Sequence, residues 1–346
     1  MSGAQPAESQ APTPRISIIV PTYNRARVLD RLLRALGRQT APVDAFEVIV
    51  IDDGSTDATT SVLAQDYGYR LRALAQLNAG PASARNAGIA CASGEIVLFV
   101  DDDVIPRDDL IERHLALHAT LCAAVIGRIA APDGVRQPAW VRWELDTLDR
   151  QYDDMVAGRF QPCARQFFTA NASVRRDALM RAGLFDPEFR RAEDVELAYR
   201  LEAQGMRFVF ANDAVVVHDT PRSLRAWMSV AEQYGEYDVL MWHRGVRYML
   251  EMTAEDLAYA RRLPLRLLAR VLVGRRLPMS VLRRLGAIGI KSADRLSRAT
   301  AARATCSVVF NLLYWDAFAR AVGGRARFWE LMTSELRPPW PAPAVE

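Results

Sequence analysis

The sequence predicts an α/β protein, with a mostly parallel β-sheet flanked by helices and a helical C-terminal appendage. Two observations predict this fold class. Over residues 15–130, short apolar runs alternate with segments of helical periodicity, and strands separated in this way pair in parallel through right-handed crossovers. After Arg222 the apolar spacing is helical nearly to the end of the chain.

The first part of the chain carries apolar runs of strand length, each followed by a segment of helical spacing. The runs predict strands at 16–20, 46–51, 71–75, 96–100 and 122–130. Apolar residues three and four apart predict helices at 28–36, 57–65, 81–92 and 108–119. These elements alternate as a parallel sheet requires.

The middle of the chain has a less regular pattern. Residues 131–165 are expected to be an irregular functional loop, because proline and glycine recur there among tryptophans and charges. Beyond it, the pattern predicts a strand at 166–174, an amphipathic helix at 194–204 closed by Gly205, and short strands at 208–210 and 214–217.

Composition excludes several classes of protein. With 50% hydrophobic and 25% charged residues, the chain of 346 residues suits a folded protein with a sizeable core. A net charge of +3 is too balanced for a general nucleic-acid binder, and no apolar run of about 18 residues marks an ordinary membrane-spanning helix. Four cysteines lie far apart, so neither a zinc site nor a disulfide framework is expected. Residues 1–14 are expected to be a disordered leader rather than a signal peptide, which predicts a cytoplasmic protein.

The average charge hides two oppositely charged parts. From Arg261 onward there are 16 basic and 5 acidic residues, so the first 260 residues carry a net negative charge. The segment 263–285 mixes leucines with arginines, and Pro264, Gly274 and Pro278 are expected to break it into short helices. Two interpretations stay open. The segment contacts an anionic membrane surface peripherally, or it packs its leucines against the rest of the protein.

Polar side chains follow the three strongest early strands, at residues 22–24, 52–53 and 101–103. Ligands bind outside the carboxyl ends of strands in open α/β sheets. Consecutive aspartates repel one another unless they are solvated or neutralised, and oxygen ligands without a nearby histidine or thiol suit Mg²⁺ or Mn²⁺. Such an ion completes its shell with substrate phosphates, which implies a nucleoside diphosphate. The alternative is that these clusters are solvated turns and helix caps.

A glycine-rich phosphate loop of the common spacings is missing from the sequence. The glycines of residues 78–88 match neither G-x-G-x-x-G nor a P-loop. A Rossmann oxidoreductase or a P-loop kinase therefore loses support.

Several motifs stand in a familiar order. They are IIVPTYN at 18–24, VIVIDDGSTD at 48–57, GPASARNAGI at 80–89, GEIVLFVDDD at 94–103, NAS at 171–173, GLFD at 183–186 and AEDVEL at 192–197. This set resembles the family 2 glycosyltransferases of GT-A fold. The resemblance covers roughly residues 15–220.

The resemblance assigns roles to the polar residues at the strand ends. It implies that the nucleotide is bound by Pro21, Thr22, Tyr23, Asn24, Asp53, Arg85, Asp101 and Asp102. Tyr23 and Asp53 match positions that hold the nucleobase. Arg85 matches a basic residue near the base or the phosphates, with a helix cap or a surface ion pair as the alternative.

The resemblance also implies a metal ion and a catalytic base. Asp103 matches the expected ligand of Mn²⁺ or Mg²⁺. His218 stands where a histidine completes the metal site in some relatives, and a purely structural histidine is its alternative. Asp194, beside Glu193, matches the base that deprotonates the acceptor hydroxyl, and its alternative role is the N-cap of the following helix.

These roles imply an inverting, metal-dependent glycosyltransferase of cell-envelope or polysaccharide biosynthesis. The donor would be a UDP-, GDP- or dTDP-sugar, and the acceptor a saccharide or a lipid-linked glycan. Without membrane spans or a Q-x-x-R-W signature, the enzyme is expected to be non-processive. We expect the transferase domain at 15–220, with a nucleotide-binding half at 15–130 and an acceptor half at 131–220, and a mainly helical region at 221–346.

Two other functions use similar residues. A sugar nucleotidyltransferase would need a glycine-rich, basic loop at 21–25, which the sequence does not carry. A non-catalytic sugar-nucleotide-binding protein would be expected to have lost Asp103 or Asp194, and both are present.

Overall fold

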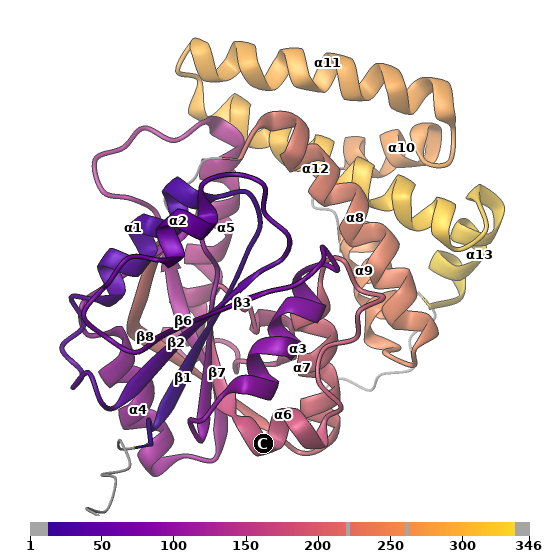
Figure 1. The fold of residues 1–346 in the computed structure, drawn as a ribbon. Helices are drawn as coiled ribbons and strands as arrows, with labels where there is room; N and C mark the ends of the chain where they lie inside the picture. The colour runs from indigo at the N-terminus through magenta and orange to yellow at the C-terminus, as the bar shows by residue number, and fades with distance from the viewer. Residues whose placement is uncertain (1–12, 219–221, 260–262, 336–346) are drawn as a thin grey trace, which may run out of the picture. The chain divides into compact units, whose positions relative to one another are not determined.

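The computed structural model describes residues 13–218, 222–259 and 263–335, which form two compact units (Figure 1). The first unit is Met1–Asp133 with Asp149–Thr220, and the second is Gly134–Leu148 with Pro221–Glu346. Residues 134–148, which the sequence pattern groups with the acceptor half, belong to the second unit. Residues 1–12 of the expected leader and the expected boundary at 220 lie outside the described residues.

The first unit is built on one eight-stranded sheet, in the order β3-β2-β1-β4-β7-β6-β8-β5 among the described residues. The strands are β1 (Ile16–Thr22), β2 (Phe46–Asp52), β3 (Leu71–Ala75), β4 (Ile96–Val100), β5 (Val104–Pro106), β6 (Ala123–Ala130), β7 (Asn171–Arg175) and β8 (Arg207–His218). Strands β5 and β7 run against their neighbours, and the other strands of this sheet share one direction. The predicted mostly parallel α/β architecture is confirmed.

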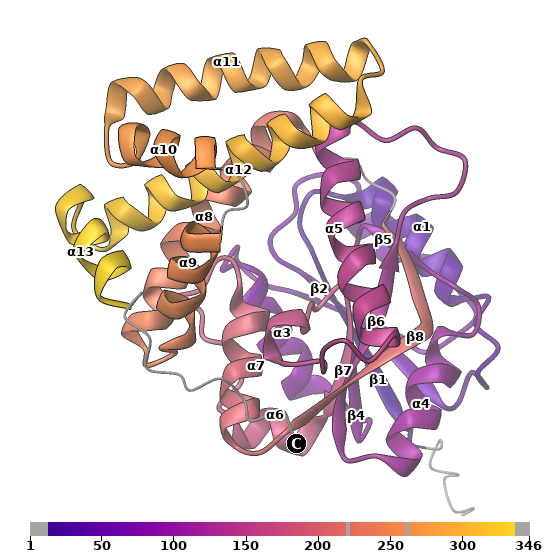
Figure 2. The same ribbon diagram turned by 180° about the vertical axis from the view of Figure 1, so that it is seen from behind.

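Helices cover both faces of the sheet (Figures 1 and 2). They are α1 (Ala26–Leu36), α2 (Thr59–Leu63) and α4 (Leu110–Thr120) on one face, and α3 (Pro81–Cys91), α6 (Arg176–Arg181) and α7 (Glu193–Ala203) on the other. Strand β1 lies between the two layers, so Ile18 and Val20 join one core and Ile19 joins the other. Burial on both faces explains why the early strands are continuous apolar runs.

The structure corrects the expected irregular loop at 131–165, because this segment contains the 18-residue helix α5 (Ala139–Val156). Proline at 138 directly precedes the helix and Gly158, at φ +68°, follows it, so the residues that interrupt the pattern mark the helix ends. The apolar side chains of α5 serve two cores. Trp143 packs against Trp227, with ring centroids 5.6 Å apart, and Tyr152 stacks on Phe210 at 4.8 Å.

The end of the sheet also differs from the sequence prediction. The two short strands expected at 208–210 and 214–217 form one 12-residue strand, β8, and a register shift between Gly127 and Arg128 absorbs the irregularity against β6. The short strand β5 pairs with the end of β8 and places Val104 opposite His218. This long-range pairing brings the residues after the third aspartate beside His218.

The second unit is helical, as predicted. It contains α8 (Leu224–His243), α9 (Tyr248–Tyr259), α10 (Leu263–Leu272), α11 (Arg276–Arg295), α12 (Ala299–Ala321), α13 (Arg325–Glu335) and the first part of α5. Helices α8 and α12 approach closely at Gly235, where a Cβ would lie 2.3 Å from the Tyr314 carbonyl oxygen. Among the described residues, no helix combines the length and the apolarity that crossing a bilayer requires.

Helix α11 is longer than the sequence pattern suggests. Gly274, at φ +77°, separates α10 from α11, as expected. Pro278 does not break α11, because it is the third residue of the helix, where a backbone N–H has no partner within the helix. Met279, Gly286 and Ile290 are the buried side of α11.

Candidate active site

The loops after β1, β2 and β4 meet at one edge of the sheet, because these strands are parallel neighbours. Asn24, at φ +53°, joins the first two loops: its backbone N–H donates to Ser55 Oγ at 2.8 Å, and its Oδ1 accepts from the Thr56 N–H at 2.7 Å. Asp57 accepts from the N–H of Ala26 at the start of α1, at 3.0 Å. Part of the predicted nucleotide motif therefore builds the loop itself.

Asp53 is buried and organises the loop between β3 and α3. Its Oδ1 accepts from the Gln76 side chain at 2.6 Å and from the Ala79 N–H at 2.9 Å, and its Oδ2 accepts from the Gly80 N–H at 2.9 Å. Tyr23 directly follows β1, and about half of its surface is exposed (48%). The edge thus combines a fixed carboxylate with an accessible aromatic ring.

The three aspartates after β4 belong to a group of five carboxyl groups, which we call the acidic cluster: Asp101, Asp102, Asp103, Glu193 and Asp194. Two arginines hold it. Arg85 is buried and donates to Asp101 at 2.7 Å and to Glu193 at 2.6 Å. Arg25 donates to Asp102 at 2.9 Å and to Asp103 at 2.8 Å. Burial acts to raise the pKa of Asp102, and despite the opposing charge of Arg25 it reaches about 6.

Thr22 and Pro21 complete the end of β1. The Thr22 hydroxyl donates to Asp102 Oδ2 at 2.8 Å, so one oxygen of Asp102 binds Thr22 and the other binds Arg25. Pro21 lies within β1, opposite Ile51 of β2. These contacts fix Asp102 and leave Asp103 closer to the edge of the cluster.

Asp194 lies in the first turn of α7 and is not its N-cap, which corrects one alternative from the sequence. The N-cap is Ala192, a non-glycine residue at φ +59°, and the helix begins at Glu193. Asp194 accepts from the Thr169 N–H at 3.2 Å and from the Val195 N–H at 2.8 Å. Burial, together with the adjacent charge of Glu193, raises the pKa of Asp194 to about 7, although Arg85 acts in the opposite direction. A carboxyl group with this pKa can take up a proton near neutral pH.

His218 and Asp103 face each other at the edge of the acidic cluster. The β5–β8 pairing brings His218 Nε2 to 3.6 Å from Asp103 Oδ2. Adjacent ligands of an octahedral ion, each about 2.1 Å from the metal, lie about 3 Å apart, so this spacing fits two ligands of one ion. Among the described residues, no three histidine, cysteine, aspartate or glutamate side chains are placed to hold one metal ion together. An ion held here would complete its shell from a bound substrate, as Mg²⁺ commonly does.

A second polar group, which we call the histidine cluster, lies between α4 and β7. It contains His114, His118, Asn171 and Ser173. The Ser173 hydroxyl is 2.7 Å from His114 Nδ1 and 2.8 Å from His118 Nε2, and Asn171 Oδ1 is 3.0 Å from His114 Nε2. Burial lowers the pKa of both histidines to about 4, so they are neutral at pH 7. Asn171 and Ser173 of the NAS motif are therefore buried in the first unit.

Sequence reasoning missed Arg25 and the histidine cluster. Arg25 directly follows the first motif, but no local signal connects it with aspartates that lie 77 and 78 residues away. His114 and His118 are four residues apart on one helix face, but nothing local connects them with Ser173. Only the packing of α4 on the sheet joins them.

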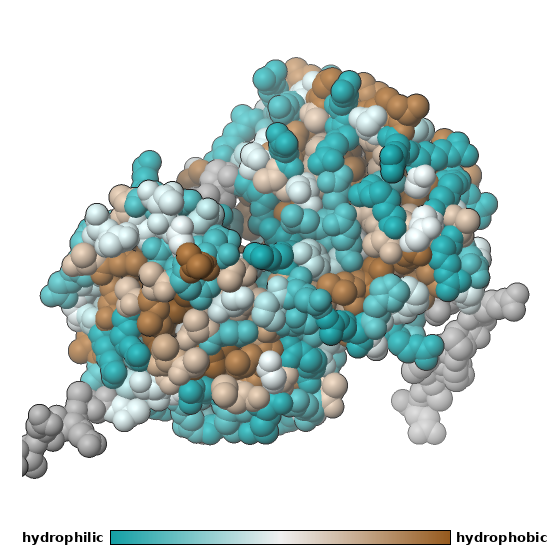
Figure 3. Space-filling model, turned by 45° about the vertical axis from the view of Figure 1, so that its right-hand side comes forward, coloured by the Kyte–Doolittle hydropathy of each residue, from teal (hydrophilic) through white to brown (hydrophobic). Residues whose placement is uncertain are grey.

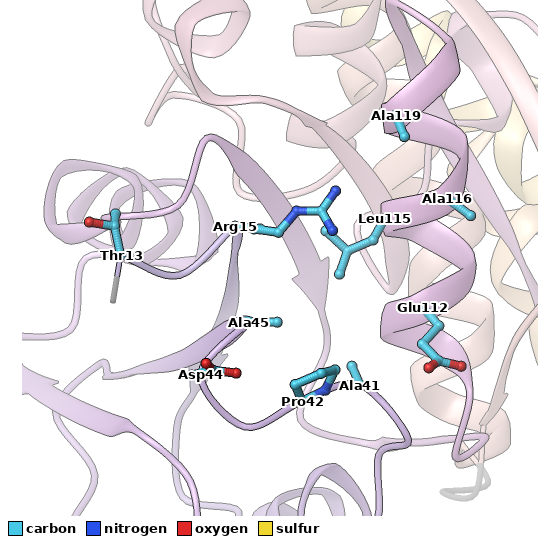
Figure 4. Close-up of a pocket in the computed structure, with 10 residues that line it drawn as sticks. All are labelled: Thr13, Arg15, Ala41, Pro42, Asp44, Ala45, Glu112, Leu115, Ala116 and Ala119. Carbon is cyan, nitrogen blue, oxygen red and sulfur yellow. The ribbon is translucent and has the colours of Figure 1, made fainter. Parts of the chain in front are cut away.

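A hollow of about 620 Å³ lies elsewhere in the first unit (Figure 4). It lies near the start of β1, and its lining includes Arg15, Asp44, Glu112 and Leu115. Because the acidic cluster follows the opposite, carboxyl ends of the strands, this hollow is separate from the candidate active site.

The fold defines the class of the protein. A solved structure of the mannosyltransferase PcManGT from Pyrobaculum calidifontis, in complex with GDP-Man and Mn²⁺, matches with a TM-score of 0.56 at 21% identity over 86% of each chain. S. aureus TarS in complex with UDP-GlcNAc matches with a TM-score of 0.54 at 19% identity, over 85% of this chain and 90% of that one. At these identities the likeness shows the fold, which is the GT-A fold of glycosyltransferases.

The sequence comparison adds a match to a family. Residues 17–182 match the model of glycosyl transferase family 2. Validoxylamine A glucosyltransferase of Streptomyces hygroscopicus subsp. jinggangensis is 32% identical over 230 residues, which cover 58% of this chain and 54% of that protein. The chain thus spans about half the length of this curated relative.

Proposed function

We propose that the protein is an inverting, metal-dependent glycosyltransferase that moves a sugar from a nucleoside diphosphate-sugar to an acceptor hydroxyl. The observation that carries this proposal is Asp194, a carboxyl group of the acidic cluster with a pKa of about 7 at the carboxyl edge of the sheet. The match of residues 17–182 to the family 2 glycosyltransferase model supports the reaction class. The bound GDP-Man and UDP-GlcNAc of the two structural neighbours support a nucleotide-sugar donor.

The nucleotide would bind at the β1 and β2 loops. Tyr23 offers an exposed ring for stacking on a base, and Asp53 offers a fixed acceptor for a base N–H. Pro21, Thr22 and Asn24 shape this edge, and Asp101 and Asp102 would meet the ribose. Arg85 is buried between two carboxylates, which supports a positioning role toward Asp101 and Glu193 rather than a phosphate contact.

In the proposed reaction Asp194 is the general base. It accepts the proton of the acceptor hydroxyl as that oxygen attacks the anomeric carbon, while the bond from this carbon to the diphosphate oxygen breaks with its electrons. Attack from the side opposite the leaving group inverts the configuration. Glu193 stays bound to Arg85, and its charge helps to keep the pKa of Asp194 high.

Asp103 and His218 would hold Mn²⁺ or Mg²⁺. When bound, such an ion neutralises the charge that develops on the departing diphosphate. The Mn²⁺ of the P. calidifontis mannosyltransferase structure supports this choice of metal. Asp103→Asn is expected to fold normally and to lose cation-dependent turnover, whereas full activity in excess EDTA would contradict the metal assignment.

The acceptor is proposed to be a saccharide or a lipid-linked glycan of the cell envelope. Among the relatives is an S. aureus poly(ribitol-phosphate) beta-N-acetylglucosaminyltransferase, which is 42% identical over 101 residues, 28% of this chain and 18% of that protein. We place the enzyme at the cytoplasmic face of a membrane, in peripheral contact through the segment 263–285 and the helix that continues it. Non-processive transfer is part of the same proposal.

The outer side of α11 supports this membrane contact. Leu277, Val281, Leu285 and Ile288, which we call the α11 ridge, are 52–80% exposed, and their spacing places them on one face. The interval 263–298 contains nine basic residues and one acidic residue, Asp294, which is bonded to Arg142 at 3.1 Å. Figure 3 shows brown apolar side chains among teal ones along the upper rim, where α11 lies. Apolar side chains beside basic ones suit an anionic bilayer surface.

Vesicle sedimentation tests this contact. Binding to phosphatidylglycerol vesicles is expected at low salt, with loss at high salt and on neutral phosphatidylcholine. The double substitution Leu277→Gln with Leu285→Gln should weaken it, whereas Leu77→Gln, at an exposed leucine of the first unit, should not. Equal recovery in the supernatant under all conditions, or dimers in light scattering that the double variant abolishes, would contradict the membrane contact.

A donor screen tests the proposed function directly. Hydrolysis or transfer of UDP-, GDP- and dTDP-sugars with Mn²⁺ is expected for one nucleotide class, and Asp194→Asn is the matched inactive control. Release of pyrophosphate from a nucleoside triphosphate and a sugar phosphate would instead identify a nucleotidyltransferase. Donor binding without any turnover would identify a non-catalytic binding protein.

A further inference from the structure

Arg25 links the two aspartates at the edge of the acidic cluster. From the N-cap position of α1, its Nη1 donates to Asp102 Oδ1 at 2.9 Å and to Asp103 Oδ2 at 2.8 Å. The Arg25 side chain is 47% exposed, whereas those of Asp102 and Asp103 are 6% and 14% exposed. A solvent-accessible cation therefore neutralises two nearly buried anions.

The oxygen that Arg25 binds is the one that faces His218. Asp103 Oδ2 is 2.8 Å from Arg25 Nη1 and 3.6 Å from His218 Nε2. An ion held by Asp103 and His218 would need this oxygen and would lie within a few ångströms of the guanidinium. Two positive charges at that separation in a partly buried site repel strongly. The arginine contact and the ion therefore exclude each other.

We propose that Arg25 is the resident counter-cation of this site and that a divalent ion displaces it. The inference rests on the metal site proposed for Asp103 and His218. Before the ion binds, Arg25 keeps adjacent carboxylates from repelling one another. The ion then takes over this role, and the guanidinium moves toward solvent, where half of its side chain already lies. Arg25 thus lowers the affinity for the ion while it stabilises the ion-free protein.

A Mn²⁺ titration without donor, followed by electron paramagnetic resonance of the free ion, tests this competition on the full chain. Arg25→Gln is expected to bind Mn²⁺ about tenfold more tightly than the natural protein, the effect of removing roughly 1.4 kcal/mol of competing interaction. Arg27→Gln, at an exposed arginine on the same helix, should leave the affinity unchanged. Adding Asp103→Asn to Arg25→Gln should abolish the gain.

Melting temperatures give an independent readout. Without Mn²⁺, Arg25→Gln should melt below the natural protein, and saturating Mn²⁺ should raise its melting temperature by more. Should Arg25→Gln not fold, Arg25→Lys carries the test, because lysine keeps the charge but makes a weaker contact and should give a smaller gain in affinity. Equal or weaker Mn²⁺ binding by the folded variants would overturn the inference. Neither readout needs turnover, so failure of the donor screen is distinguishable from failure of this proposal.

Discussion

The acidic cluster and the histidine cluster lie in the same unit but treat charge in opposite ways. The acidic cluster keeps carboxylates at the sheet edge, balanced by Arg25 and Arg85. In the histidine cluster, Ser173 and Asn171 bind neutral imidazoles in the interior. The acidic cluster thus depends on arginine counter-charges, whereas the groups that join α4 to the sheet are neutral and hydrogen-bonded.

The two clusters are expected to change stability with pH in opposite directions. The folded-state pKa of His114 and His118 is about 4, below the ordinary 6.5, so the unfolded chain binds more protons between these values and stability falls as the pH drops through them. The folded-state pKa of Asp102 is about 6 and that of Asp194 about 7, above the ordinary 3.8. For these groups the folded chain binds more protons, so stability rises as the pH drops from about 7 toward 4.

The largest expected effect is a loss of turnover when Asp194 of the acidic cluster is replaced. Asp194→Asn should lower turnover by about 10²–10⁴-fold, the usual contribution of a general base, with little change in donor affinity. The natural enzyme should lose activity as the pH falls below about 7, because the base must be unprotonated. Steady-state kinetics against pH measure both, with Asp177→Asn on α6 as the control. Near-normal turnover with a lower melting temperature would mean that Asp194 only supports the helix.

Removing the buried cation should cost the most stability. Arg85→Leu leaves the buried Glu193 and the partly exposed Asp101 without their cation, and breaking a buried ion pair costs about 3–5 kcal/mol. Arg113→Leu removes exposed ion pairs with Asp109 and Asp213 and should cost far less stability. Denaturant unfolding compares the two variants. Equal losses would show that burial does not distinguish the acidic cluster from the surface.

The histidine cluster should affect stability alone. Ser173→Ala removes the hydroxyl that both imidazoles contact and should cost about 1–3 kcal/mol, the price of an unsatisfied buried group. Donor affinity, measured by calorimetry with a nucleoside diphosphate, should not change. A weaker affinity for the nucleoside diphosphate with unchanged stability would show that the histidine cluster belongs to the functional site.

The smallest expected effect is a stability gain. Asp194→Asn removes a partly buried carboxylate whose pKa is raised, so at pH 8 it should raise the melting temperature by about 2–4 °C per kcal/mol recovered, and the gain should shrink toward pH 5. The sign follows because the ionised form is the one that burial disfavours. Thermal scans at the two pH values check it. An equal gain in melting temperature at both pH values would show that the ionisation of Asp194 does not cause it.

Several site features could be predicted because they are local. The polar motifs at 22–24, 52–53 and 101–103 directly follow apolar strands, and parallel strands bring their carboxyl ends to one edge. The contacts of Arg25 with Asp102 and Asp103 could not be predicted, and the proximity of Asp103 to His218 is expected only from the family resemblance. They depend on pairs that are 77 to 115 residues apart, and no local spacing encodes such a contact.

The sequence by itself determined the α/β class, the alternation of strands and helices, the helical C-terminal part and the position of its acidic motifs. Hydrophobic periodicity and turn residues act over a few neighbouring positions, so they can be recognised in the sequence. Tertiary structure alone decided how α5 divides between two cores, which leucines of α11 remain exposed, and how far the pKa of Asp194 rises. These properties depend on which surfaces meet, because burial and charge pairing are set by distant partners rather than by adjacent residues.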